Sequence, residues 1–581
     1  MDWKLEFIFI LIKFTVSLGD VLDNRGYEFI IAFMENRPYP KNMELFVATF
    51  SGDIVNVTVS TPKYYGKYSV HRQFQLSRGR AEHVSINTKL QMFGSTLSPK
   101  GILIQATDEI IVYGVNRRAD SVDAFLGLPT DVLGGEYYAV SFLPTEKRSH
   151  SKHYAQLLVV ANFEDTQVQI TFPESDDFSN VTFDGNEYDG GETLAITMNR
   201  CEALQLQING YGDMTGAYLQ SDKPVAFFSG NARTVVGNGY TSDHLVEQLI
   251  STDRWGKQFV VVPVPGRDVG DYLKVVGYIG STEIDIKCIS NNPINTSVRI
   301  VLAKAGSYQL LEMEPRSYCY IVSNNSIFVV YIVKSRQQND FHDPSMIMIP
   351  PMEQYAPEYV FTTIRLVNGM YKNYFLFVVE QENKDGLRLD GMPFPADTDY
   401  VSIPNTTLVA GYVMVGEGFH RFYHMSPISV FGGILYGQYS FESYGLPVGL
   451  RMAEINKADG AWMVRLTVLT VVEDIQHIPE TVLLGARKKS QFKNTNNIAF
   501  PKTRTIAEMP VPGPSYASRA VGITTVEVRN AATKTCDSDT ETDMACCIKA
   551  FFKTVIATTT IAIKTESEPS IPINKLPGLK K

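Results

Sequence analysis

Cysteine and tryptophan are scarce in this sequence, with six cysteines and three tryptophans among 581 residues. No Cys-x-x-Cys pair occurs, so the spacing typical of a structural zinc site is missing. Six cysteines are also too few for a dense disulfide framework in a chain of this length. Stability must therefore come mainly from hydrophobic cores, and we expect neither a cofactor nor a metal.

Sequence motifs of the common enzyme classes are missing as well. There is no G-x-S-x-G, H-E-x-x-H or Walker A sequence, and no glycine-rich dinucleotide fingerprint after a strand. The net charge of −9 is small for this length and argues against a dedicated nucleic-acid binder. The most apolar internal segment, residues 550–563, carries Lys553 and a run of three consecutive threonines, which disfavours a membrane span.

Aromatic and β-branched residues, in contrast, are abundant. The 30 tyrosines and 32 phenylalanines favour half-buried pleated surfaces. Short apolar runs, such as residues 45–50, 54–60 and 102–106, recur about every eight to twelve residues between Gly, Asn, Asp or Pro turns. This spacing predicts an all-β protein of the sandwich or barrel class with few short helices.

A longer repeat lies above this pattern. Four hairpin-like segments share an apolar strand, a polar turn and an alternating strand; they are residues 44–60, 155–172, 272–287 and, more weakly, 374–390. Each is followed by a second shared segment; these are residues 106–116, 221–231, 323–333 and 425–437. We therefore predict about four tandem antiparallel sandwich-like units of roughly 100–115 residues each.

Helical periodicity is nearly absent. The clearest candidate is residues 242–250, S-D-H-L-V-E-Q-L-I, where Ser242 could cap the helix. Its apolar residues share one helical face; they are Leu245, Val246, Leu249 and Ile250. His244 and Glu247 could then form a metal or acid–base cluster, although a capped helix with a solvated polar face is the simpler interpretation.

The two ends of the chain differ from this pattern. Residues 1–19 resemble a signal peptide, with Lys4 before an apolar run and small residues near the expected cleavage point. We assign residues 20–120 to a first β unit, 121–455 to about three further units and 456–485 to a β extension. Residues 486–581 form a basic stretch and then a Pro/Thr/Ser-rich tail that we expect to be largely disordered.

Features of a secreted glycoprotein accompany this N-terminus. Five N-glycosylation sequons are present; they begin at Asn56, Asn180, Asn295, Asn324 and Asn405. Cys288 and Cys319 fall within one repeat and could pair, and Cys536 could pair with Cys546 or Cys547. Cys201 and the remaining tail cysteine could pair with each other, stay free or join another chain.

Several separated segments resemble one known family. They are residues 126–142, 156–170, 221–231, 243–263 and 343–355, among them S-D-K-P-V-A-F-F-S-G-N and D-H-L-V-E-Q-L-I-S-T-D-R-W-G-K. In this order and spacing they are similar to the N-terminal domain of the IgGFc-binding protein family, over roughly residues 120–450. The resemblance implies a secreted or mucus-associated protein with an immunoglobulin-Fc-like or mucin-like partner.

A ligand-binding surface is predicted near Trp255. If Trp255 is exposed beside Tyr240 and Arg254, it could stack on a sugar or anchor a protein partner, with Lys257 adding positive charge. The alternative is a tryptophan packed into the core between units. We therefore expect a non-enzymatic binding or adhesion protein whose loops contact an extracellular protein or glycoprotein.

Two other functions remain open from sequence. A secreted carbohydrate-active enzyme would need two carboxylates about 5–10 Å apart; the candidates are Asp222, Asp243, Glu247 and Asp271. A structural mucus or matrix component could assemble through a spare cysteine. The Ser-Asp-Lys-Pro segment before Val225 is interpreted as a turn that starts a core strand, with Pro224 at the first strand position.

Overall fold

The computed structural model describes residues 23–36, 43–52, 54–118, 121–144, 154–290, 296–337, 342–366 and 369–456, and the backbone of residues 463–472 and 520–529. The chain divides into two compact parts, residues 20–459 and residues 1–19 with 460–581. In the second part, β34 (Met463–Val472) pairs antiparallel with β35 (Ala520–Arg529). β35 lies inside the stretch that we assigned to a disordered tail.

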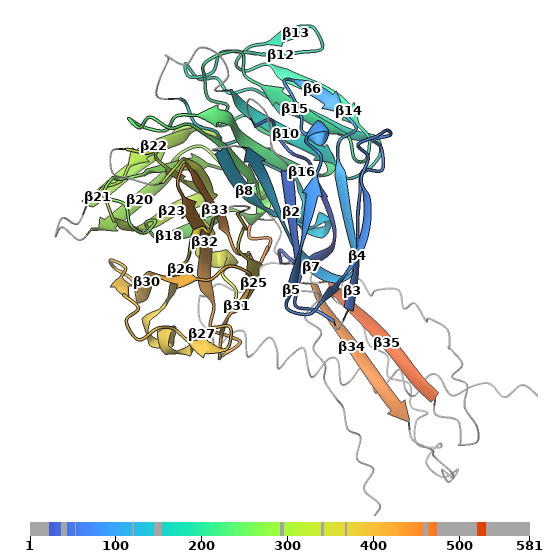
Figure 1. The fold of residues 1–581 in the computed structure, drawn as a ribbon, viewed down its shortest axis with the longest axis vertical. Coiled ribbons are helices and arrows are strands. Elements are labelled where there is room, and N and C mark those ends of the chain that lie inside the picture. The colour runs from blue at the N-terminus through green and yellow to red at the C-terminus, as the bar shows by residue number, and fades with distance from the viewer. Residues whose placement is uncertain are drawn as a thin grey trace, which may run out of the picture. The chain divides into compact units, whose positions relative to one another are not determined.

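Residues 20–459 form four consecutive β units (Figure 1). The first contains β1 (Gly26–Ile31), β2 (Met43–Thr49), β3 (Ile54–Ser60), β4 (His71–Ser77), β5 (Arg80–Ile86), η1 (Thr88–Leu90), β7 (Ile102–Arg118) and β8 (Ser121–Gly127). The second contains η2 (Thr130–Val132), β9 (Gly134–Tyr138), β10 (Ala155–Ala161), β11 (Thr166–Thr171), β12 (Val181–Phe183), β13 (Asn186–Tyr188), β14 (Thr193–Met198), β15 (Ala203–Gln207), β16 (Tyr218–Thr234) and β17 (Asp243–Gln248). Strand β6 (Thr96–Ser98) joins the second unit by pairing with β15. The tandem all-β organisation expected from the sequence is thus confirmed.

The other two units follow in chain order. The third contains η3 (Thr252–Arg254), β18 (Gly256–Val261), β19 (Tyr272–Gly277), β20 (Thr282–Ile289), β21 (Thr296–Leu302), β22 (Tyr308–Glu312), β23 (Tyr318–Val333) and β24 (Ser345–Met348). The fourth contains η4 (Met352–Gln354), β25 (Glu358–Thr362), β26 (Lys372–Glu380), η5 (Gln381–Gly386), β27 (Leu387–Leu389), β28 (Met392–Pro393), β29 (Val401–Ser402), β30 (Leu408–Val415), β31 (Phe419–His424), β32 (Phe431–Tyr439) and β33 (Glu442–Pro447).

One long strand organises each of the first three units. The first half of β7 pairs with β1 and β3, and its second half pairs with β2 and β8. β16 and β23 change partners in the same way, from β9 and β11 to β10 and β17, and from β18 and β20 to β19 and β24. Because one strand belongs to two half-sheets, each unit closes into a small antiparallel sandwich.

The polar segment predicted to be a turn lies at this change of partners. Ser221 is the last β16 residue paired with β11, and Val225 is the first paired with β10. The interpretation of Pro224 as the start of a strand is therefore wrong, because β16 already begins at Tyr218. The extra residues form an irregularity inside a continuous strand, where proline and an unpaired N–H group are tolerated.

Equivalent polar side chains secure this irregularity in three units. The side-chain oxygen of Thr107 accepts the N–H of Asn56 at 3.0 Å, and Asp222 accepts that of Gln167 at 2.8 Å. In the third unit, Asn324 accepts the N–H of Glu283 at 2.9 Å. Asp222 and its counterparts therefore hold the neighbouring hairpin strand in place.

Two other expectations need correction. Residues 243–248, predicted to be helical, form strand β17, whose side chains are all buried. The fourth predicted hairpin is also wrong, because β26 pairs with β30 and β32, whereas β27 pairs with β31 in a separate sheet. The disulfide between Cys288 and Cys319 is confirmed and joins facing positions of β20 and β23. Cys201 is free and buried, and the tail cysteines lie outside the described residues.

The last strand of each unit forms an inner ring. Strand β8 contacts β17 and β33, and β24 contacts the same two strands, so the four strands close on themselves. Hydrogen bonds between Asn24 and Leu450 join the beginning and end of this part of the chain, at 3.1 Å and 3.0 Å. Apolar side chains of the ring belong to two buried clusters, a larger one mainly in units one, two and four and a smaller one mainly in unit three.

Candidate functional site

One of the buried carboxylates in the inner ring, Asp123, accepts hydrogen bonds from all four inner strands. Asp123 accepts backbone N–H groups of Ala124 in β8, Val246 in β17 and Met346 in β24, at 3.0, 3.0 and 3.3 Å. A backbone hydrogen bond from Gly445 in β33 completes the set. Burial raises the pKa of Asp123 well above its usual range, and these four donors oppose the rise only in part. Asp123 thus ties one N–H group of every unit to a common point.

Two further acidic groups lie near the beginning of the inner strands. Asp243 is the first residue of β17, and Asp343 precedes β24 by two residues. Ser121 donates its hydroxyl to Asp243, and Asp343 donates its backbone N–H to the Ser443 hydroxyl at 2.9 Å. Burial, and then the nearby charge of Asp343, raises the pKa of Asp243. Burial likewise raises the pKa of Asp343 to about 7, although Thr241, Arg233 and Arg336 act against the rise. The negative charge of Glu442 also raises the pKa of Asp343.

The buried guanidinium of Arg117 joins the first and fourth units. It donates to Glu442 at 3.0 Å, to the Tyr371 hydroxyl at 3.1 Å and to the Arg365 carbonyl at 3.0 Å. Glu44, from the first unit, lies 3.4 Å from the same guanidinium. All three charged side chains of this network are largely out of solvent, so it can be stable only because the partners are matched.

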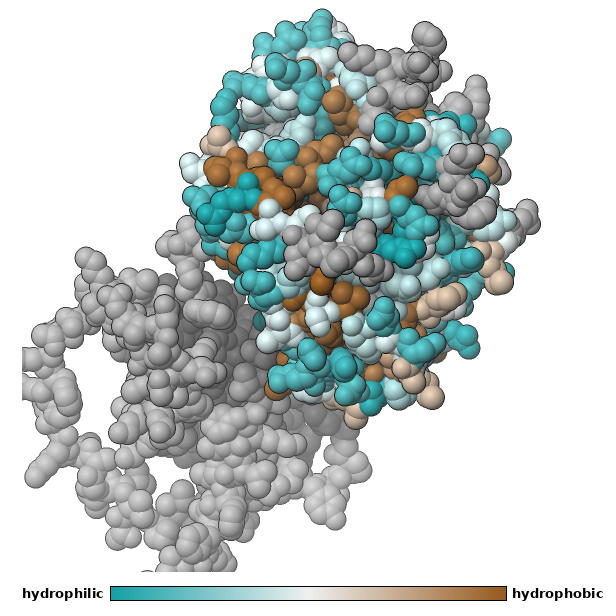
Figure 2. All heavy atoms as spheres, turned by 90° about the vertical axis from the view of Figure 1, so that its left-hand side faces the viewer, coloured by the Kyte–Doolittle hydropathy of each residue, from teal (hydrophilic) through white to brown (hydrophobic). Residues whose placement is uncertain are grey.

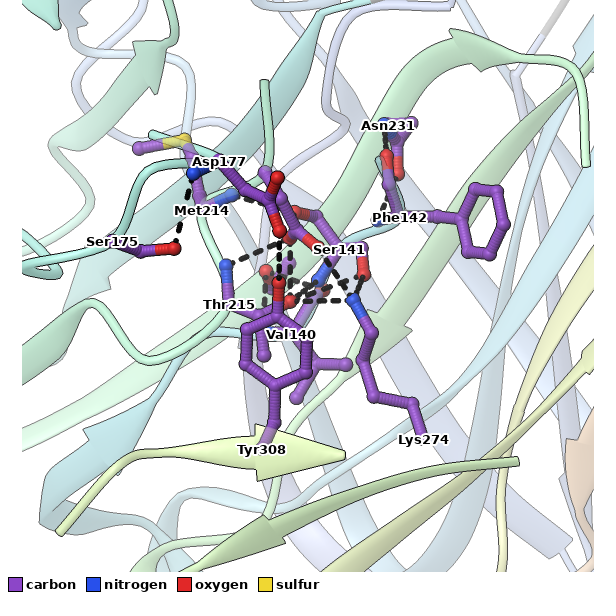
Figure 3. A network of polar contacts seen from close by, with 12 residues as sticks. Val140, Ser141, Phe142, Ser175, Asp177, Met214, Thr215, Asn231, Lys274 and Tyr308 are labelled. Carbon is purple, nitrogen blue, oxygen red and sulfur yellow. Dashed lines mark hydrogen bonds and ion pairs between the residues drawn. The ribbon is translucent and has the colours of Figure 1, made fainter. Parts of the chain in front are cut away.

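A second buried ion pair connects the second and third units (Figure 3). The Lys274 ammonium donates to Asp213 and to the Ser141 carbonyl, both at 2.6 Å, and to the Thr215 hydroxyl at 3.0 Å. It also lies 4.4 Å from the centre of the Tyr308 ring. Burial alone would raise the pKa of Asp213, but Lys274 and the hydroxyl donors of Ser141 and Thr215 outweigh it and hold that pKa below its usual value.

Neither network resembles a reaction centre. Lys274 is 1% exposed and Asp213 is 2% exposed, so a substrate has no access to the pair. His244 is also buried, with its ring nitrogens near the Asn231 carbonyl and the Asn116 amide, and burial lowers its pKa to about 4. The predicted pairing of His244 and Glu247 on one helical face is wrong, since β17 is a strand. Among the described residues, no group of three His, Cys, Asp or Glu side chains could hold a metal ion.

The residues proposed for ligand binding are divided between the core and the surface. Trp255 is 1% exposed and packs on Tyr138 and Phe328, which corresponds to the core alternative. Arg254 is also buried, where it pairs with Asp253 at 2.7 Å. Tyr240 and Lys257 are exposed. Of the four, only these two are placed to meet a partner.

The carboxylates considered for a carbohydrate-active enzyme do not share an open cleft. Asp243 and Glu247 are fully buried in the inner ring, and burial raises the pKa of Glu247. Asp271 is buried against the Tyr331 hydroxyl at 2.6 Å. Asp222 lies on β16, where it caps the β11 backbone. Each carboxylate therefore has a local structural partner.

Exposed aromatic groups gather at the end of the ring where the inner strands begin. Tyr240 is 64% exposed and Phe441 is 41% exposed. The backbone N–H of Tyr240 donates to the Arg336 carbonyl at 3.1 Å, and the Arg336 guanidinium lies 4.4 Å from the centre of the Phe441 ring. Tyr240 was predicted from the sequence to bind a ligand, whereas Phe441 was not, because the hairpin that presents it was not predicted.

One protein-family model matches this chain. The model of the IgGFc binding protein family matches residues 123–437, more than half of the chain. The chain belongs to the IgGFc-binding protein family. The match begins at Asp123 and includes the second and third units and the larger part of the fourth.

Two similar proteins show how much of each chain the similarity covers. The human (Homo sapiens) IgGFc-binding protein is 25% identical over 403 residues, which make up 68% of this chain and 7% of the human protein. A solved tetra-tandem repeat from the extending region of a large adhesion protein covers 68% of this chain and 91% of its own at 10% identity. Its TM-score is 0.09, which carries no argument about the fold. No helix among the described residues is long and apolar enough to cross a membrane.

Proposed function

We propose that this protein is a secreted, non-enzymatic binding protein that recognises a protein or glycoprotein partner through the loops of its β units. The observation that carries the proposal is membership of the IgGFc-binding protein family over residues 123–437. The closed inner ring supports it, because a rigid scaffold with exposed loops can present a fixed contact surface.

Secretion is supported by the disulfide and by the positions of the sequons. A disulfide between Cys288 and Cys319 suits an oxidising compartment. Asn56, Asn324 and Asn405 are exposed, and Asn180 is half-buried. Asn295 and the apolar N-terminal segment lie outside the described residues.

Expression of the full chain in cultured animal cells tests the secretion. We expect the protein in the medium, without residues 1–19, and with a mass that falls after treatment with peptide N-glycosidase. A chain that stays inside the cell without glycans would contradict this part of the proposal.

The partner class is tested with the secreted full chain immobilised on a biosensor. The probes are the Fc fragment of immunoglobulin G, purified mucin and the same mucin after removal of its glycans. Saturable binding of any of them supports a binding function, and loss of mucin binding with the glycans identifies a glycoprotein partner. Absence of binding to all three would favour the structural alternative.

The structural alternative has its own test. Assembly through Cys201 is disfavoured, because its side chain is 1% exposed and burial raises its pKa to about 11. Cross-linking would therefore have to use the tail cysteines. Electrophoresis without reductant separates a disulfide-linked polymer from a monomeric binding protein.

A further inference from the structure

Five neighbouring side chains form what we call the aromatic rim: Tyr240, Arg336, Met370, Tyr439 and Phe441. The first two come from the segments after β16 and β23, and the other three come from the fourth unit. Met370 is 72% exposed and Tyr439 is 39% exposed. The rim therefore combines aromatic, apolar and cationic side chains from four separate segments of the chain.

Hydrogen bonds and ring contacts support four of the five rim residues. Arg336 accepts the Tyr240 N–H with its carbonyl, donates its own N–H to the Thr241 hydroxyl at 2.9 Å and stacks on Phe441. Tyr439 lies in the same hairpin as Phe441 and packs on buried Tyr371, with ring centres 6.3 Å apart. These contacts hold the rings before any partner arrives, which lowers the entropy lost on binding.

The backbone of Phe441 argues for a role beyond folding. Ser440 and Phe441 form the two-residue connection between β32 and β33, and Phe441 has a φ of 61°. A bulky side chain is disfavoured in this left-handed region, where glycine or asparagine fits readily. The ring is also partly exposed, so burial does not explain why phenylalanine is present. Such backbone strain is concentrated at functional sites.

Charge at this end of the ring indicates the chemistry of the partner. The described acidic groups nearby, Asp243 and Asp343, are buried, and the Glu442 side chain is 14% exposed. Lys372, on the strand next to β32, is exposed, and Arg233 and Arg336 are partly exposed. What this surface offers to solvent is therefore aromatic and cationic.

We propose that the aromatic rim is the docking surface for a protein partner that presents an acidic segment with neighbouring apolar side chains. The inference rests on the proposed binding function and deepens it by naming the surface. Tyrosine, phenylalanine, methionine and arginine are the residue types enriched where proteins meet.

A second group of exposed apolar side chains lies on β21 and β30. Figure 2 shows the side of the molecule that carries β20, β21 and β30, where apolar groups lie in separate clusters among polar side chains. Val298 and Val301 on β21, and Tyr412 and Met414 on β30, are exposed there. No strained backbone and no supporting cation–ring contact is found at those four residues in the described structure, so nothing indicates what would cover them.

Selection of random phage-displayed peptides on the immobilised full chain tests the proposal. We expect the selected peptides to contain Asp or Glu beside aromatic or aliphatic residues. Their affinity should fall about tenfold or more in Phe441→Gly, because an anchoring ring is lost. The melting temperature of this variant should stay the same or rise, since glycine fits the left-handed backbone. The matched control is Tyr65→Gly, which removes another exposed aromatic side chain, 86% exposed, in the first unit.

The cationic part of the proposal needs a second variant. Arg336→Gln should weaken binding and reduce its dependence on salt, because one charge contact is removed. Enrichment of no peptide, or equal binding to wild type and Phe441→Gly, would overturn the docking surface. Glycan-array binding that is lost in Phe441→Gly, with no peptide binding, would replace the protein partner by a sugar and so overturn the proposal as stated.

These results are separable from those for the proposed function. If the Fc fragment or mucin binds wild type and Phe441→Gly equally, the binding function stands and the aromatic rim is wrong. If neither probe binds but selected peptides do so through Phe441, the surface stands and the partners suggested by family membership are wrong.

Discussion

Replacement of Lys274 by methionine should strongly destabilise the junction between the second and third units. Methionine keeps most of the side-chain length but removes all three hydrogen bonds of the ammonium group, to Asp213, Ser141 and Thr215. The Asp213 carboxylate then remains buried without a counter-charge. Removing one partner of a buried ion pair costs about 3–5 kcal/mol.

The low end of this range is the better expectation. Asp213 keeps its bonds from the Ser141 hydroxyl at 2.6 Å and from the backbone N–H of Thr215 at 2.9 Å. These donors still solvate the carboxylate, so we expect a loss of about 3 kcal/mol in the free energy of unfolding. The double variant Asp213→Leu, Lys274→Met removes both charges and should recover most of that loss, because two apolar side chains need no partner.

Urea unfolding followed by tryptophan fluorescence measures the effect. Trp255 packs between Tyr138 of the second unit and Phe328 of the third, so its emission reports on the same junction. Trp462→Phe in the background makes Trp255 the sole tryptophan of the secreted protein, because Trp3 lies in the segment that we expect to be removed. A loss below about 1 kcal/mol in Lys274→Met, or a double variant as unstable as the sum of the two single variants, would refute this account of the pair.

Three further predictions concern other parts of the described structure. Burial raises the pKa of Asp343 from 3.8 to about 7, so its contribution to stability is fully present below about pH 4 and is lost as the pH rises through 7. The Asp343→Asn variant should therefore become more stable relative to wild type as the pH rises from 4 to 7, by at most about 4 kcal/mol. Thermal unfolding at a series of pH values measures this. A stability difference between variant and wild type that does not change with pH would contradict the raised pKa of Asp343. Cys288→Ser with Cys319→Ser should lower the unfolding free energy by about 3–4 kcal/mol, measured in urea, and an unchanged midpoint would mean that the β20–β23 pairing needs no link. Gly230→Ala should prevent secretion of folded protein, because the added Cβ would lie 1.9 Å from the Leu245 carbonyl oxygen. The control Gly416→Ala should be secreted normally, because no atom lies within 4 Å of its added Cβ. Equal yields of the two variants on a blot of the medium would show that β16 and β17 can separate.

The repeated strands could be predicted from the sequence because their patterns are local. The first three hairpins alternate clearly on one strand, as in β3, where Val55, Val57 and Val59 are buried and Ile54 and Asn56 are exposed. Such alternation identifies a strand with one solvated face. The apolar second half of each long strand was also predicted, but the polar segment before it was interpreted as a turn, so the continuity of β7, β16 and β23 was missed.

Strand β17 shows why the inner ring could not be predicted. Every side chain from Asp243 to Gln248 is buried, so the strand lacks the alternation that distinguishes it from a helix. Its spacing of Leu245, Val246 and Leu249 matches one helical face by coincidence. Asp123 was missed for a related reason, because one carboxylate in an apolar run is a weak signal until its four donors are brought together by distant segments.

The polar residues of the inner ring differ among units that otherwise share a strand plan, and this difference has a structural consequence. The first positions of β8, β17 and β33 are Ser121, Asp243 and Glu442, and each has its own partner: Ser121 meets Asp243, and Glu442 meets Arg117. Exchanging two units would leave a buried charge without its partner, at a cost of several kcal/mol. The buried polar pairs therefore fix the order of the units around the ring, while the exposed loops, including the one that carries Phe441, remain free to vary with the partner.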